Sequence, residues 1–104
     1  MKNIQAKNIV DVIRTGKVIL IFHGSNCFNC KIMEPIFNQL EQSFPLVKFY
    51  LVNIDAYPKI LQTYQISALP TLLPFRHGQK LPAIIGLKSF SILKQLIDQS
   101  LNYA

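Results

Sequence analysis

The chain has 104 residues, half of them hydrophobic, and a formal net charge of +6 at pH 7. A chain of this size can bury a core of its own, and we expect residues 1–104 to form a single domain. The eleven lysine and arginine residues are scattered, which argues against nucleic acid as a partner. The apolar segments are too short to cross a membrane or to form the core of a signal peptide, so we expect a cytoplasmic protein with no membrane partner.

Hydrophobic periodicity predicts strands and helices in near alternation along the chain. In chain order, the expected elements are a short strand over residues 3–7, a helix over 8–15, a strand over 18–22, a helix over about 28–44, a strand over 47–52, a short helix over about 58–64, a strand over 71–75, a hairpin turn at 76–79, a strand over 81–85 and a helix over 89–101. The strand over 18–22 is apolar throughout, which is typical of a strand buried on both faces.

The resulting order, βαβαβαββα, predicts an α/β fold with a mixed central sheet flanked by helices on both faces and an antiparallel final hairpin. In open sheets of this class, functional sites form beyond the carboxyl ends of the strands. Cys27 occupies such a place, since it follows the strand over 18–22 and a turn at 23–26. Pro74 lies inside a predicted strand and lacks a backbone N–H, so we expect a bulge or local unpairing there.

The two cysteines, Cys27 and Cys30, are three positions apart at the predicted start of a helix. Free N–H groups and the helix dipole favour a thiolate at that place, so Cys27 is the expected nucleophile and Cys30 the resolving thiol. A Cys-x-x-Cys pair in this setting is typical of dithiol–disulfide chemistry. A zinc site within the chain would need two further ligands, and His23 and His77 are far apart in the sequence. We expect no metal and no cofactor, with a metal or cluster shared across a dimer as an alternative.

Several motifs spread over about residues 8–100 resemble those of the thioredoxin family. They are the strand at 18–22, Cys-Phe-Asn-Cys-Lys at 27–31, Pro35, Asn-Ile-Asp at 53–55, the segment 66–73 that contains Pro70, and Gly86. The resemblance implies a thioredoxin fold and a thiol–disulfide oxidoreductase that acts on protein disulfides in cell redox homeostasis. It also implies an external electron donor such as a thioredoxin reductase. The alternative is a non-catalytic protein-binding module with the same fold.

The same resemblance points to the residues that contact a substrate. It implies that the Leu69–Pro70 bond is cis and faces the cysteines, and that the backbone of Leu69 can pair with an extended substrate. Phe28 and Asn29, between the cysteines, are expected to contact the substrate as well. Phe28 is expected to be exposed as part of the docking surface.

Besides the motif at residues 26–30, two positions near the cysteines depart from the family. A buried aspartate lies six residues before the first cysteine in the family and has a lysine partner, and here Ile21 and Leu51 stand at those places. The usual proton acceptor behind Cys30 is therefore missing. His23 should lie on the same strand face as Ile21 and titrates near neutral pH, which makes it a candidate general base. The alternative is a structural histidine. Asp55 is expected only to accept a local hydrogen bond where the helix over 58–64 begins.

Overall fold

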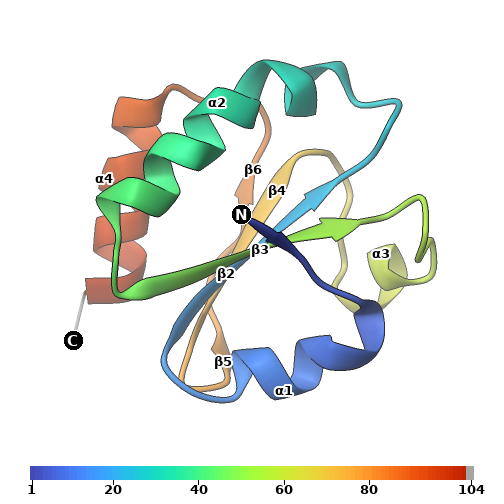
Figure 1. The fold of residues 1–104 in the computed structure, drawn as a ribbon, viewed down its shortest axis with the longest axis horizontal. Coiled ribbons are helices and arrows are strands. Elements are labelled where there is room, and N and C mark those ends of the chain that lie inside the picture. The colour runs from blue at the N-terminus through green and yellow to red at the C-terminus, as the bar shows by residue number, and fades with distance from the viewer. Residues whose placement is uncertain (103–104) are drawn as a thin grey trace.

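A mixed six-stranded sheet lies at the centre of the computed structural model, which describes residues 1–102 (Figure 1). The strands are β1 (Lys2–Asn3), β2 (Lys17–His23), β3 (Val47–Asn53), β4 (Thr71–Arg76), β5 (Gln79–Lys80) and β6 (Ile84–Ile85). Their spatial order is β1-β3-β2-β4-β5, and β6 also pairs with β4. Strands β1, β3 and β2 are parallel, whereas β4 is antiparallel to β2, β5 and β6.

Helices cover both faces of this sheet (Figure 1). On one face lie α2 (Phe28–Ser43) and α4 (Phe90–Asn102). On the other face lie α1 (Ile9–Ile13), which follows the 3₁₀ turn η1 (Ala6–Asn8), and α3 (Ile60–Thr63). The predicted fold class, an α/β fold with a mixed sheet between two helical layers, is confirmed.

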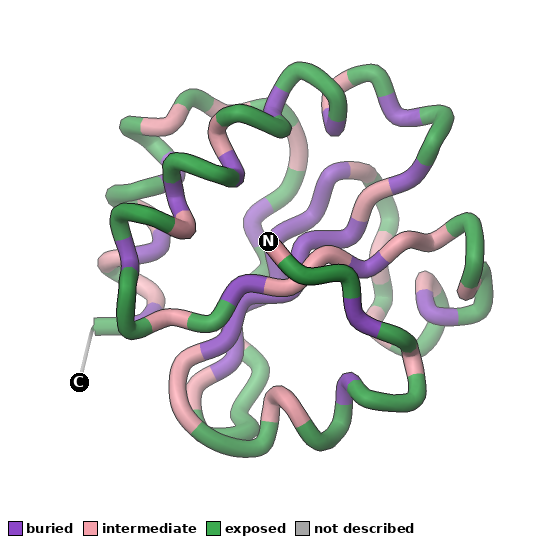
Figure 2. Tube along the Cα trace, viewed as in Figure 1, coloured by how far each residue is buried: buried purple, intermediate pink, exposed green. Residues whose placement is uncertain are grey.

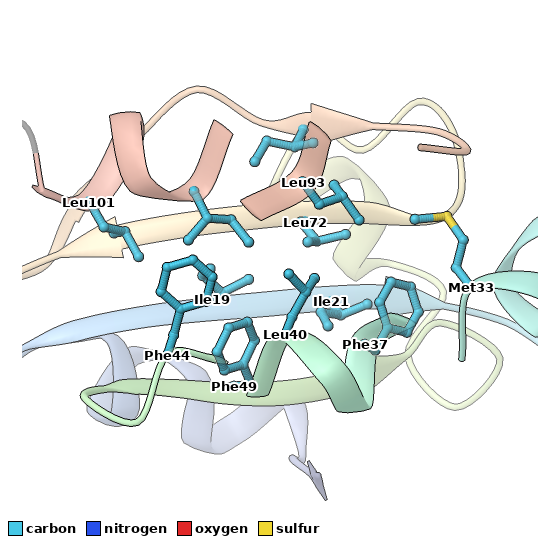
Figure 3. Packing of buried hydrophobic residues seen from close by; sticks show 12 residues of the cluster. Ile19, Ile21, Met33, Phe37, Leu40, Phe44, Phe49, Leu72, Leu93 and Leu101 are labelled. Atoms are coloured by element: carbon cyan, nitrogen blue, oxygen red, sulfur yellow. The ribbon is translucent and has the colours of Figure 1, made fainter. Parts of the chain in front are cut away.

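Strand β2 runs through the middle of the core and is buried on both faces, as predicted (Figure 2). Its side chains alternate between the two helical layers. Ile19 and Ile21 join the apolar cluster formed with α2 and α4 (Figure 3). Val18, Leu20 and Phe22 join the cluster formed with α1 and α3. This alternation determines on which side of the sheet the end of β2 presents its last side chain.

The hairpin partner of β4 is divided into two short strands, β5 at Gln79–Lys80 and β6 at Ile84–Ile85, where a turn over 76–79 and a single strand over 81–85 were expected. Pro74 explains the division. It has no N–H to donate, and neither Leu73 nor Pro74 has a partner residue in β5 or β6. The carbonyl of Pro74 still accepts one hydrogen bond from the N–H of Leu81, at 2.9 Å. The local unpairing predicted at Pro74 is therefore confirmed, whereas the predicted partner strand was wrong in its bounds, because pairing begins at Gln79 and is absent at 81–83.

Helix α1 covers Ile9–Ile13, where 8–15 was expected, and two other elements are also shorter than their sequence patterns predict. Strand β1 covers only Lys2–Asn3, where 3–7 was expected, because the chain turns into η1 directly afterwards. Helix α3 covers Ile60–Thr63, where 58–64 was expected. Turns occupy the residues before it, since the N–H of Tyr57 donates to Ile54. None of these differences alters the sheet order that positions the site.

Candidate active site

Cys27 and Cys30 form a disulfide at the beginning of α2, directly after the loop that leaves β2. Cys27 is the N-cap of this 16-residue helix and has extended backbone angles, φ −109° and ψ 101°. Its sulfur accepts a hydrogen bond from the backbone N–H of Cys30, at 3.1 Å. The N-terminal N–H groups of a helix have no partner within the helix, so this sulfur occupies a place that favours negative charge.

Burial does not distinguish the two cysteines, because Cys27 is 9% exposed and Cys30 is 7% exposed. Their positions on the helix do distinguish them. The Cys27 sulfur receives the N–H at the helix start, whereas Cys30 lies inside the first turn and lines a cavity of about 440 Å³. The cavity and the helix start therefore give the two sulfurs different surroundings.

The residues between the cysteines have unequal exposure. Phe28 is 75% exposed, so the predicted exposure of this aromatic ring is confirmed, and Asn29 is half-buried. Ile32, one turn further along α2, is also exposed, at 45%. An apolar surface thus lies beside the disulfide and borders the first turn of α2.

Leu69 and Pro70 lie at the same end of the sheet as the cysteines. Strands β2 and β4 are antiparallel with Phe22 opposite Thr71, so the carboxyl end of β2 meets the segment that leads into β4. The Leu69–Pro70 bond is cis, the isomer that the family resemblance implied. Pro70 is buried and its carbonyl accepts a hydrogen bond from the N–H of Gly86, at 2.9 Å.

His23 is the last residue of β2 and lines the same cavity as Cys30. Its Nε2 atom is buried and has no hydrogen-bond partner among residues 1–102. Burial lowers the pKa of His23 below its ordinary value of 6.5, while the nearby carboxylates of Asp55 and Glu34 act in the opposite direction. The neutral imidazole is therefore the favoured form, and that is the form that can accept a proton.

Asp55 contributes to this site in a way that the sequence pattern missed. Its Oδ2 accepts a hydrogen bond from the backbone N–H of Ser25, at 2.8 Å. The expectation that Asp55 accepts a local hydrogen bond where the following helix begins is wrong, because its donor is 30 positions away and α3 has no side-chain cap hydrogen bond. The parallel pairing of β2 with β3 was the available signal: it places His23 beside Asn53, so the next residues of both strands come together.

The pair of apolar substitutions inferred from the family pattern is also adjacent in the structure. Ile21 of β2 and Leu51 of β3 are register partners. Ile21 is completely buried, and Leu51 lines the cavity that contains His23 and Cys30. Both positions of the family's charged pair are therefore apolar in this chain. The ionisable side chains that line the cavity beside Cys30 are those of His23, Lys31, Glu34 and Asp55.

Residues 1–102 contain no group of three or more histidine, cysteine, aspartate or glutamate side chains arranged to hold a metal ion. None of the helices within these residues combines the length and hydropathy that a membrane span needs.

Comparison with known proteins finds similarity over nearly the whole chain. The model of the Thioredoxin family matches residues 1–99. A thioredoxin of Chlamydia caviae is 34% identical over 99 residues, which cover 95% of this chain and 97% of the relative. Thioredoxin-1 of Saccharomyces cerevisiae is 30% identical over 80 residues and is covered to 77%, as is this chain. The solved structure of oxidised mitochondrial thioredoxin 3 of Saccharomyces cerevisiae has a TM-score of 0.87 at 26% identity, covering 95% of this chain and 94% of that chain.

Proposed function

The chain belongs to the thioredoxin family and is a thiol–disulfide oxidoreductase, and from this premise we propose that Cys27 is its attacking thiol and Cys30 its resolving thiol. The observation that carries this assignment is the hydrogen bond from the N–H of Cys30 to the sulfur of Cys27 at the N-cap of α2. A thiolate is stabilised by such donors and by the positive end of the helix dipole. Cys30 lies in the first turn of α2, three positions after Cys27, and is therefore placed to attack a mixed disulfide formed at Cys27.

The exchange then takes place in two steps. The Cys27 thiolate attacks one sulfur of a substrate disulfide, so that a Cys27–substrate bond forms, the substrate disulfide breaks and the released thiolate takes a proton from water. Cys30 next loses its proton and attacks the sulfur of Cys27. The Cys27–Cys30 bond forms, the mixed disulfide breaks, and the second substrate sulfur leaves as a thiolate. The substrate gains two electrons and the enzyme's dithiol is oxidised.

His23 is the general base that takes the proton from Cys30 in the second step. Both residues line one cavity, and the buried Nε2 of His23 has no hydrogen-bond partner among the described residues. Because burial lowers the pKa of His23, the imidazole is neutral and free to accept a proton near neutral pH. The apolar pair at Ile21 and Leu51 provides no competing base.

Protein disulfides are the substrates, and they dock on the surface formed by Phe28, Asn29, Leu69 and Pro70. The exposed Phe28 ring supplies an apolar contact, and the segment before β4 supplies backbone groups for an extended chain. An external electron donor such as a thioredoxin reductase regenerates the dithiol. We also propose that the protein is cytoplasmic and that residues 1–104 form a single domain.

The roles of the two cysteines are tested by trapping the mixed disulfide. We expect Cys30→Ser to form a stable covalent adduct through residue 27 with a peptide that contains a disulfide, because no resolving thiol remains. The matched variant Cys27→Ser should form little adduct under the same conditions. Intact-mass spectrometry measures both. Efficient trapping by Cys27→Ser and none by Cys30→Ser would reverse the assignment.

A further inference from the structure

The loop between β2 and the cysteines is held against the end of β3 by three close contacts. The carbonyl of His23 accepts a hydrogen bond from the N–H of Ile54, at 2.9 Å. The N–H of Ser25 donates to Asp55 at 2.8 Å. Between them, a Cβ atom added to Gly24 would lie 3.1 Å from Ile54 and 3.3 Å from Asp55. The loop therefore depends on a glycine for its close approach and on a carboxylate for its hydrogen bond.

Asp55 also acts on the imidazole at the beginning of this loop. Its negative charge raises the pKa of His23 and thereby opposes the effect of burial. Hydrogen bonds from Ser25 hold the pKa of Asp55 below its ordinary value of 3.8, so its carboxylate is charged throughout the neutral range. Asp55 therefore accepts a hydrogen bond from the loop and also acts electrostatically on His23, the candidate base.

The other charged or titratable groups around the cavity are few among the described residues. Helix α2 contributes Lys31, Glu34 and the thiol of Cys30 in the reduced state. The N-terminal residue, Met1, also lines the cavity, and its amine pairs with Glu41 at 3.4 Å. Glu34 is the second carboxylate that acts on His23, and it belongs to α2, whereas Asp55 follows β3.

We propose that Asp55 is a positioning residue for disulfide exchange, which fixes the loop from His23 to Cys27 and sets the charge environment of the His23 imidazole. Asp55 does not touch the reacting sulfurs. It acts through the Ser25 N–H on the placement of the loop, and through space on the protonation of His23. The proposal rests on the proposed function of His23 as the base for Cys30.

Two variants of Asp55 separate its hydrogen bond to the loop from its electrostatic effect on His23. Asp55→Asn retains an oxygen that can accept the Ser25 hydrogen bond but removes the charge, whereas Asp55→Ala removes both. Because Asp55 is exposed, its electrostatic effect on His23 is screened by salt, while the hydrogen bond to the loop is much less sensitive. Asp11→Asn is the matched control, since it removes an exposed carboxylate from α1, on the other face of the sheet.

The test is an NMR titration of the His23 imidazole in the oxidised protein, together with the pH profile of disulfide exchange. We expect Asp55→Asn to lower the pKa of His23 relative to the wild type and to the Asp11→Asn control, by an amount that shrinks in 1 M NaCl, where the screening length is about 3 Å. We expect Asp55→Ala to slow the resolving step by about tenfold, less than the 10²–10⁴-fold that a general base supplies.

An unchanged His23 pKa in Asp55→Asn, or a wild-type rate in Asp55→Ala, would overturn the positioning role. The two proposals fail separately. If His23→Ala retains the wild-type rate, the base assignment is wrong. The influence of Asp55 on His23 is still read directly from the titration, which needs no turnover.

Discussion

Placing a carboxyl group at Ile21 should destabilise the protein by about 2.5–6 kcal/mol. Ile21 is completely buried and packs in the cluster between β2, α2 and α4 (Figure 3). Losing the burial of an isoleucine side chain costs about 1.5–3 kcal/mol, and burying a polar group without a partner costs about 1–3 kcal/mol. The register partner is Leu51, which offers no positive charge to the new aspartate. The expected loss is a large share of the ~5–15 kcal/mol that stabilises a typical domain.

The assay is urea unfolding of oxidised Ile21→Asp, followed by far-UV circular dichroism at pH 7. Ile21→Val is the matched control and should lose only about 0.5–1.5 kcal/mol. The double variant Ile21→Asp/Leu51→Lys should recover part of the loss, because the two positions are paired on adjacent strands and the charges then offset each other. The reasoning is refuted if Ile21→Asp loses no more than the valine control, or if adding lysine at position 51 brings no recovery.

Three further predictions concern His23 and Phe28. We expect His23→Ala to slow the resolving step about 10²–10⁴-fold and to flatten its pH profile; stopped-flow measurements that give a wild-type profile would exclude the base role. Because burial lowers the pKa of His23, the unfolded state binds its proton more readily, so stability should fall as the pH drops below 6.5. Urea unfolding at a series of pH values should show less of this acid sensitivity in His23→Gln, and equal sensitivity would contradict the effect. Since Phe28 is 75% exposed, Phe28→Ala should raise KM for a protein disulfide while changing the unfolding free energy by less than about 0.5 kcal/mol; an unchanged KM would remove Phe28 from the docking surface.

Features encoded by local hydrophobic pattern were predictable from the sequence. The apolar run around Ile19 predicts a strand buried on both faces, and β2 is such a strand. The helical spacing of Met33, Phe37 and Leu40 predicts the face of α2 that packs on the sheet, and all three are buried. In both cases the period of the pattern directly reflects the geometry of the element.

Features that depend on contacts between distant segments were not predictable in the same way. The missing N–H of Pro74 predicts a local unpairing, but the places at which β5 and β6 pair with β4 depend on the strand register. The hydrogen bond from Ser25 to Asp55 joins residues 30 positions apart, and it forms only because β2 and β3 are parallel neighbours. In the sequence, Asp55 precedes a short helix, and a local hydrogen bond explains its place there. Its actual donor, the Ser25 N–H, is apparent only from the pairing of β2 with β3.

Reduction of insulin by dithiothreitol, followed by turbidity, is the most direct measurement of disulfide exchange through Cys27 and Cys30. We expect catalytic amounts of the wild-type protein to accelerate insulin precipitation, with each molecule turning over many times, and Cys27→Ser to give the rate of dithiothreitol alone. A wild-type rate no faster than dithiothreitol alone would contradict the oxidoreductase assignment and would favour a binding module with an inert disulfide.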